Sequence, residues 1–134
     1  MIFIREGGAF LGASIAEHLV LPAFGLDLHY PLRRRIDGLA LPLRASLWPF
    51  KELVYRFARP RLAPESLDAL PEIRRAILVD DTASTGRTIR AAVEALEVHG
   101  IPRSSIRVAV LRCGERAKRE VDVFLTDGRA WVRR

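Results

Sequence analysis

The residues best suited to chemistry are two adjacent carboxylates, Asp80 and Asp81, which follow an apolar run and precede a turn rich in hydroxyl groups. The run from Ala76 to Val79 can be buried on both faces, as an interior strand of a parallel sheet requires. We therefore expect the two carboxylates to emerge where that strand ends. Oxygen ligands at such a position suit the hydroxyls of a phosphorylated sugar or a hard divalent cation.

The turn that follows is suited to an anion. It offers hydroxyls at positions 82, 84, 85 and 88, and its glycine, Gly86, is free to take positive φ. Apolar residues then recur at helical spacing, which predicts a helix that begins at this turn: Ile89, Ala92, Val93 and Leu96. Unpaired N–H groups and the helix dipole at that end both favour negative charge.

A purely structural interpretation is also available. Carboxylates before Thr or Ser often cap a helix, and a glycine can serve the turn alone. Capping accounts for one of the two acidic residues, and it does not call for four hydroxyls together. The functional interpretation therefore has the stronger support.

The run from Val79-Asp80-Asp81 through Thr85-Gly86-Arg87-Thr88 resembles the phosphoribosyl-pyrophosphate (PRPP) motif of type I phosphoribosyltransferases. With Ile89 to Ala92 included, it is most similar to the pyrimidine-operon attenuation protein/uracil phosphoribosyltransferase family. The resemblance implies that Asp80 and Asp81 hold the ribose hydroxyls and, with them, magnesium. It implies that the 5-phosphate is bound by Thr82, Ala83, Ser84, Thr85, Gly86, Arg87 and Thr88.

Composition favours one small domain, residues 1–134, with its own core, because the chain has 134 residues of which 49% are hydrophobic. The net charge of +6 permits a polyanionic partner such as RNA, although a solvated basic surface would give the same charge. The chain has a single cysteine, Cys113, which excludes an internal disulfide. The apolar residues at the start of the sequence are interrupted by Arg5 and Glu6. We expect a cytoplasmic protein.

Strand and helix patterns alternate along the chain. Strands are expected at 2–4, 26–30, 106–111 and 121–125, and a first helix at 9–20, with Phe10, Leu11, Ser14, Ile15, His18 and Leu19 on or beside one face. Gly100 and Pro102 should close the helix after the acidic motif. This order predicts an α/β fold, a mostly parallel phosphoribosyltransferase-like sheet flanked by helices, with ligands beyond the carboxyl ends of the strands.

The first strand-to-helix turn carries Glu6, Gly7 and Gly8. In the resembling enzymes a short loop at this place binds pyrophosphate, so the resemblance assigns that role to these residues, with Arg33 as a further contact. Glu6 would repel pyrophosphate unless it turns away or meets magnesium. Glycines at such a turn are also ordinary punctuation, and Arg33 can equally belong to a solvated charge run.

Residues 31–75 are broken by prolines and are expected to form an irregular, reduced hood, with a brief amphipathic helix at 50–57. The resemblance implies that this hood is small, reordered or supplied by a partner chain. In the tail, Trp131 and Val132 follow the last expected strand. In related enzymes a similarly placed aromatic residue stacks on the purine, so the resemblance makes Trp131 and Val132 candidates for the base site. The alternative is that Trp131 only anchors the tail to the core.

The function implied is transfer of the phosphoribosyl group of PRPP to a nucleobase with release of pyrophosphate, Mg²⁺ being held largely by the substrate's diphosphate. A homodimer is expected. Two alternatives remain: a PRPP-sensing regulator that binds nucleic acid through a degenerate transferase site, and a subunit completed by another chain. The nucleobase is not identified by the sequence.

Overall fold

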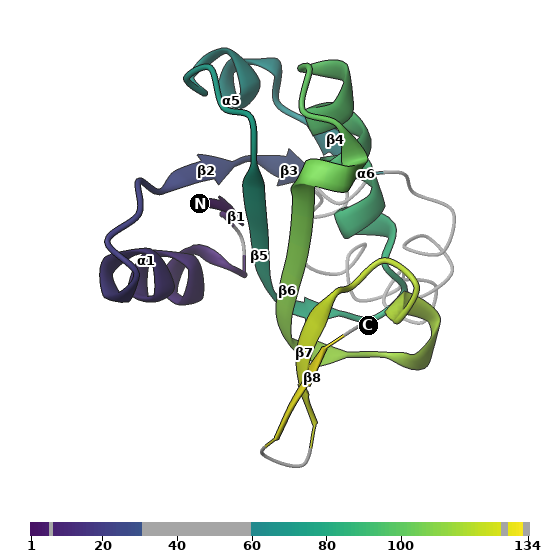
Figure 1. The fold of residues 1–134 in the computed structure, drawn as a ribbon. Coiled ribbons are helices and arrows are strands. Elements are labelled where there is room, and N and C mark those ends of the chain that lie inside the picture. Colours follow the sequence, from purple (N-terminus) through teal and green to yellow (C-terminus); the bar gives the residue numbers. More distant parts are fainter. Residues whose placement is uncertain (6, 31–59, 127–128, 133–134) are drawn as a thin grey trace, which may run out of the picture.

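The computed structural model describes residues 1–5, 7–30, 60–126 and 129–132 (Figure 1). Its main sheet has six strands in the order β2-β1-β5-β6-β7-β8. They are β1 (Ile2–Ile4), β2 (Phe24–Leu26), β5 (Ala76–Ala83), β6 (Ile106–Cys113), β7 (Val123–Thr126) and β8 (Arg129–Val132). The first five in the sheet order run parallel, and β8 is antiparallel to β7. The predicted mostly parallel α/β fold is confirmed.

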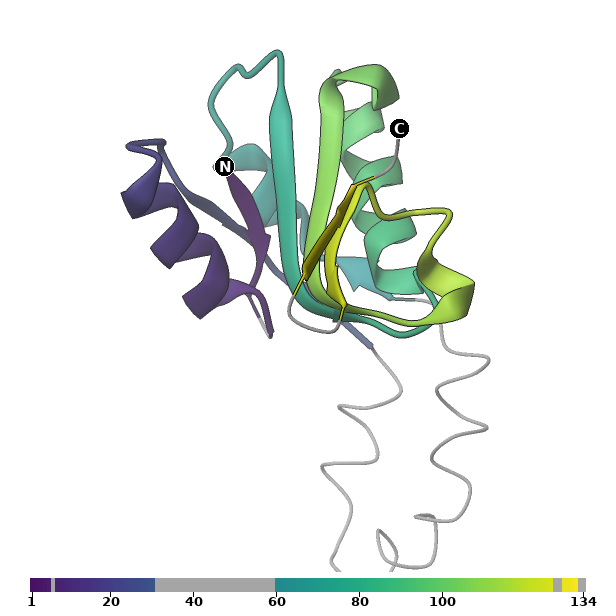
Figure 2. The ribbon, with the colours of Figure 1, turned by 60° about the horizontal axis from the view of Figure 1, so that its bottom comes forward.

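Two helices flank this sheet on opposite sides, as Figures 1 and 2 show: α1 (Ala9–His18) and α6 (Arg87–Val98). A small antiparallel sheet pairs β3 (Leu28–His29) with β4 (Arg61–Leu62). The remaining described elements are the short helix α5 (Pro64–Asp68) and the 3-10 turns η2 (Arg103–Ser105) and η3 (Glu115–Ala117). Thus β4 and α5 lie inside the region expected to be irregular, and the helix expected at 50–57 falls outside the described residues.

The main core lies between the sheet and α6. The four apolar positions predicted from helical spacing, Ile89, Ala92, Val93 and Leu96, are all buried. They pack with alternate strand residues such as Leu78 and Val108, as the period of two in a strand requires. The predicted glycine closure of α6 is also confirmed. Gly100 has φ of 100°, and the N–H of Ile101 donates to the carbonyl of Leu96, which is a Schellman ending.

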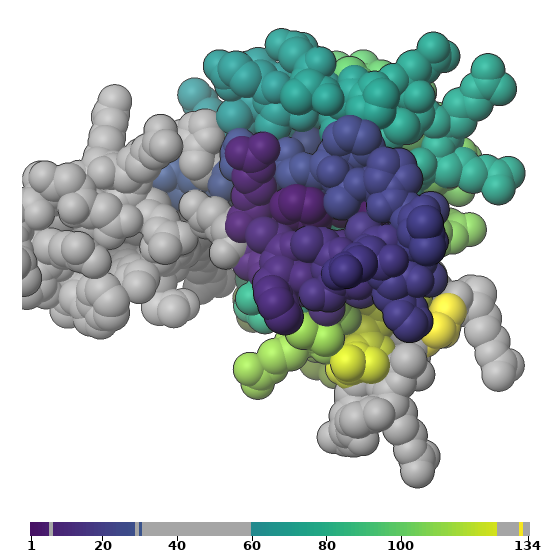
Figure 3. Space-filling model, turned by 90° about the vertical axis from the view of Figure 1, so that its left-hand side faces the viewer, coloured from purple at the N-terminus to yellow at the C-terminus, as the bar shows by residue number. Residues whose placement is uncertain are grey.

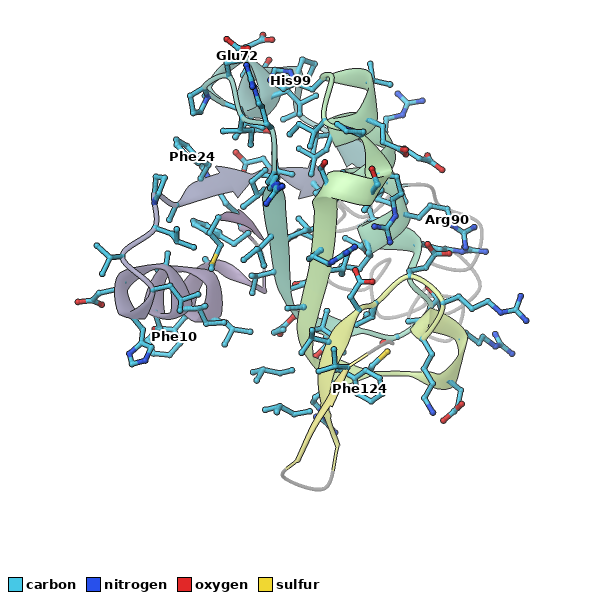
Figure 4. All side chains as sticks on the ribbon, in the orientation of Figure 1. Phe10, Phe24, Glu72, Arg90, His99 and Phe124 are labelled. Atoms are coloured by element: carbon cyan, nitrogen blue, oxygen red, sulfur yellow. The ribbon has the colours of Figure 1, made fainter. Side chains whose placement is uncertain are left out.

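The residues expected on or beside one face of α1 are not the ones that the helix buries. Phe10 is 86% exposed and lies on the outside of the helix (Figure 4), and Leu19 is exposed as well. The buried residues are instead Gly12 and Ala16. A Cβ atom at Gly12 would lie 2.4 Å from the Cβ of Phe3, so the helix approaches β1 too closely for a large side chain. The N-terminal segment, purple to blue in Figure 3, forms the middle of that face of the molecule.

Three predicted boundaries differ from the structure. The strand expected at 26–30 is split, because the chain leaves the main sheet after β2 and joins β4 through β3. Helix α1 ends at His18 rather than at residue 20, and Val20 has positive φ. Strand β5 runs on to Ala83, past the residue where we expected it to end. Within the described ranges, no helix is both long and apolar enough to cross a bilayer.

Candidate functional site

The acidic pair, Asp80 and Asp81, lies where β5 is still paired with β6 but no longer with β1. Strand β5 pairs with β1 only as far as Val79, but its pairing with β6 continues to Ala83. Asp80 and Asp81 therefore lie within β5 but beyond its last pair with β1, which corrects the expectation that they follow the strand. Asp80 is buried, Asp81 is exposed, and the N–H of Asp81 donates to Oδ1 of Asp80 at 2.9 Å. The Asp80 carboxylate is thus buried and held by a backbone N–H group, whereas Asp81 is exposed to solvent.

The first turn of the chain packs directly on this pair. A Cβ atom at Gly7 would lie 2.3 Å from Oδ1 of Asp81 and 3.1 Å from Oδ1 of Asp80. At Gly8 it would lie 2.5 Å from the carbonyl oxygen of Val79. We call Gly7 and Gly8 the diglycine turn. Only residues without a side chain allow this approach, so the structure brings the turn and the carboxylates together. Glu6 and Arg33 lie outside the described residues.

The residues from Thr82 to Thr88, here called the hydroxyl loop, connect β5 to α6. Gly86 immediately precedes α6 and has φ of 76°, a left-handed conformation that favours glycine. Four members are exposed, namely Thr82, Ser84, Thr85 and Arg87, whereas Ala83 and Gly86 are buried and Thr88 is half-buried. Exposed hydroxyls at the start of a twelve-residue helix therefore stand beside the acidic pair, as an anion site requires.

Three residues that the sequence did not single out support the hydroxyl loop. The hydroxyl of Tyr30 lies 2.8 Å from Oγ1 of Thr88. The N–H of Gly114 donates to the carbonyl of Ala83, and a Cβ there would lie 2.5 Å from the carbonyl oxygen of Ser84. Glu120 packs against Gly86. Gly114 directly after a buried strand was a usable signal, but nothing local marks the other two.

The residues present suit a magnesium ion only if a phosphorylated substrate supplies some of its ligands. In the described parts of the chain, no group of three or more His, Cys, Asp or Glu side chains could hold a metal by itself. Asp80 and Asp81 offer carboxylate oxygens, and the space that a Cβ at Gly7 would fill lies against both. Mg²⁺ is commonly bound through one or two carboxylates plus the oxygens of a phosphorylated substrate. The pair fits that mode of binding.

The tail residues form part of a hairpin rather than a free end. Trp131 lies in β8, where its backbone is paired with Phe124 of β7, and Val132 is paired with Val123. Val132 is 58% exposed. Strand β7 adjoins β6, two strands away from β5. This position leaves the base-binding assignment of Trp131 and Val132 a proposal.

A surface cavity of about 670 Å³ lies at the opposite end of the strands. Among the residues that line it are Ile2, Ala76 and Arg107, at the amino ends of β1, β5 and β6. Neither the acidic pair nor the hydroxyl loop contributes to it. Ligands of parallel α/β sheets bind beyond the carboxyl ends of the strands, so we place the candidate site at the acidic pair.

The phosphoribosyl transferase domain family matches residues 42–129, which include β5, the hydroxyl loop and α6. The chain belongs to this family. It is 48% identical over 126 residues to "Bifunctional protein PyrR" of Geobacter sulfurreducens, a match that covers 92% of this chain and 61% of that protein. The protein of the same name from Geobacter sp. strain M21 is 35% identical over 115 residues, or 83% and 55% of the two chains. The chain thus spans a little over half the length of these relatives.

Among solved structures, Helicobacter pylori xanthine-guanine-hypoxanthine phosphoribosyltransferase superposes with a TM-score of 0.61. The superposition covers 98% of this chain and 71% of the other, at 18% sequence identity. That similarity shows the fold. The family match and the relatives confirm the predicted resemblance to type I phosphoribosyltransferases of the PyrR-like group.

Proposed function

We propose that this chain transfers the 5-phosphoribosyl group of PRPP to a nucleobase. In this reaction a ring nitrogen of the base forms a bond to C1 of the ribose. The bond from C1 to the diphosphate oxygen breaks, pyrophosphate leaves with the electron pair, and the proton lost by the base passes to water. The transition state has oxocarbenium character, as in glycoside cleavage, so the protein must hold the sugar and stabilise the departing anion.

The residues divide this work by position. Asp80 and Asp81 hold the ribose hydroxyls, and their negative charge favours the positive charge that develops on the sugar. The exposed members of the hydroxyl loop, with the N–H groups at the start of α6, bind the 5-phosphate. The backbone of the diglycine turn faces the leaving group. Mg²⁺ held between the carboxylates and the substrate would supply the countercharge for pyrophosphate.

One observation carries this proposal above all: the backbone of Gly7 lies so close to the acidic pair that a Cβ atom there would meet both carboxylates. Capping of α6 would need neither a second acidic residue nor a glycine packed against it. The contact joins the loop proposed for pyrophosphate to the residues proposed for ribose, so C1 of PRPP would lie between them. The described chain is proposed to act as a single domain of this kind.

The direct test is turnover. Purified protein with PRPP and Mg²⁺ is offered uracil, guanine, hypoxanthine, xanthine and adenine, and mononucleotide and pyrophosphate are quantified by mass spectrometry. Formation of one mononucleotide with an equal amount of pyrophosphate is expected. Tight PRPP binding without turnover on any base would contradict the transferase and leave a sensor.

The base site is proposed at Trp131 and Val132. Stacking on an aromatic ring is worth ~1–3 kcal/mol per base, so Trp131→Ala should raise the KM for the base by about 5- to 150-fold and leave the KM for PRPP nearly unchanged. A residue that only anchors the hairpin would instead lower the melting temperature with both constants intact. Measuring melting and both constants on one variant separates the two roles, and a purely thermal effect would remove Trp131 from the base site.

A second function is favoured by charge and by the relatives. The net charge is +6, and two relatives carry the name "Bifunctional protein PyrR". We therefore keep a PRPP-responsive regulator that binds nucleic acid as the alternative. Affinity for a structured RNA that falls steeply with salt and changes on addition of PRPP would support it. RNA affinity unaffected by PRPP would argue against the sensor.

A further inference from the structure

The aliphatic part of an acidic side chain, that of Glu120, lies directly against the loop that is proposed to bind a phosphate. A Cβ atom at Gly86 would lie 2.9 Å from Cγ of Glu120 and 3.4 Å from Cα of Ala117. Gly86 is the residue that precedes α6, so Glu120 packs at the end of the helix where the dipole favours an anion. Left uncompensated, its negative charge would oppose the 5-phosphate.

The compensating charge comes from α6 itself. The guanidinium of Arg90 donates from both Nη2, at 2.5 Å, and Nε, at 3.2 Å, to Oε1 of Glu120. The Glu120 side chain is 23% exposed and that of Arg90 is 57% exposed. This hydrogen bond and the charge of Glu120 raise the pKa of Arg90, whose guanidinium remains charged at any working pH. Figure 4 shows Arg90 at the outer side of α6.

We propose that the Arg90–Glu120 pair sets the affinity of the hydroxyl loop for phosphate. Arg90 offsets the negative charge that Glu120 brings to the loop, and the Glu120 side chain packs against Gly86. Arg90 is thus a positioning residue that acts on the ligand through Glu120. The inference rests on the proposed function, since it assigns the hydroxyl loop to the 5-phosphate of PRPP. It names a determinant of affinity that lies outside the acidic motif.

The pair predicts an asymmetry that a mere structural contact would not give. Arg90→Gln leaves Glu120 unopposed and should weaken binding of ribose 5-phosphate by about fivefold. Glu120→Gln leaves Arg90 as an extra cation beside the loop, so it should leave affinity unchanged or improve it. The double variant should return to within about twofold of the parent protein, because both charges are gone.

The experiment is isothermal titration of ribose 5-phosphate and of PRPP with Mg²⁺ into the parent protein and these three variants, at low salt and at high salt. The penalty of Arg90→Gln should shrink at high salt, because its cause is charge. Arg103→Gln is the matched control: it removes the same charge by the same substitution, but Arg103 lies in η2, before the amino end of β6 and therefore at the opposite end of the strands from the hydroxyl loop. This control should not change either affinity.

If Arg90→Gln and Glu120→Gln weakened ligand binding equally, with parallel losses in melting temperature, the inference would be overturned and the pair would have only a structural role. Melting curves on every variant therefore accompany the titrations. If the parent protein binds PRPP but the variants follow that symmetric pattern, only this inference fails. If the parent protein binds neither PRPP nor ribose 5-phosphate, the proposed function itself fails.

Discussion

The diglycine turn and the hydroxyl loop both connect a parallel strand to a helix at the same edge of the sheet, yet their electrostatic surroundings are opposite. Gly7 lies against the carboxylates of Asp80 and Asp81. The hydroxyl loop contains no acidic residue, although Asp81 directly precedes it, and the Glu120 side chain that packs against its glycine is paired with Arg90. An anion at the first loop would need a cation to offset these carboxylates, whereas an anion at the second would meet N–H groups and hydroxyls. The same connection in one fold can thus serve two parts of one substrate.

The largest effect should come from adding one methyl group to the first loop. Gly7→Ala places a Cβ only 2.3 Å from Oδ1 of Asp81, so the carboxylate must move. Because Asp81 is exposed and can turn outward, the fold should survive, but a misplacement of this size should lower kcat/KM by about 100-fold. Steady-state kinetics and melting on the same variant measure both effects.

Gly8→Ala is the contrasting variant for this loop. Its Cβ would meet the backbone oxygen of Val79 at 2.5 Å, which cannot turn away, so the melting temperature should fall. If Gly7→Ala destabilised the protein as much as Gly8→Ala, the first glycine would be a structural residue and the contact would carry no function.

The next effect concerns magnesium. Pyrophosphate binding should weaken at least about tenfold when Mg²⁺ is chelated, because the ligand would then face Asp80 and Asp81 unscreened. Ribose 5-phosphate should bind with nearly the same affinity in either case, because its phosphate is proposed to bind to the hydroxyl loop and its neutral hydroxyls to the acidic pair, and neither contact needs a cation. Calorimetric titrations with and without EDTA make the comparison. An equal dependence of both ligands on Mg²⁺ would remove the electrostatic distinction between the loops.

A smaller effect is expected for the same substitution in the second loop. Gly86→Ala forces a side chain into left-handed backbone, at a cost of ~1–2 kcal/mol. Its Cβ meets the flexible side chain of Glu120, which can give way. Ribose 5-phosphate binding should therefore weaken several-fold with a modest loss of stability. Ser84→Ala, in the same loop but exposed and without φ strain, should be nearly neutral. A larger loss from Ser84→Ala would move the phosphate contact to that hydroxyl.

The features that the sequence predicted well are local ones. The apolar spacing of α6, its glycine ending and the acidic motif each fit within a few turns of chain, where period and residue type determine the structure. For α1, helical spacing alone pointed to a face of large apolar residues, but the residues that the helix buries are small. The contact with Phe3 requires the small Gly12 instead.

The features that the sequence did not predict depend on neighbours far along the chain. Strand β5 extends to Ala83 because β6 continues beside it, which no pattern within β5 reveals. Tyr30 and Glu120 reach the hydroxyl loop from two connecting segments far apart in the chain, by contacts that depend on the folded topology. The diglycine turn was assigned by resemblance, and only the fold shows that it lies against the acidic pair. Local signals located the motif, and tertiary packing supplied its surroundings.

The central claim is that the acidic pair binds the ribose of PRPP with magnesium, and the change in melting temperature on adding PRPP and Mg²⁺ tests it most directly. The parent protein should be stabilised strongly by the ligand. The double variant Asp80→Asn, Asp81→Asn should fold, because Asn keeps the size of each side chain, and should lose most of that stabilisation. A ligand-induced shift in the double variant equal to that of the parent protein would contradict the account.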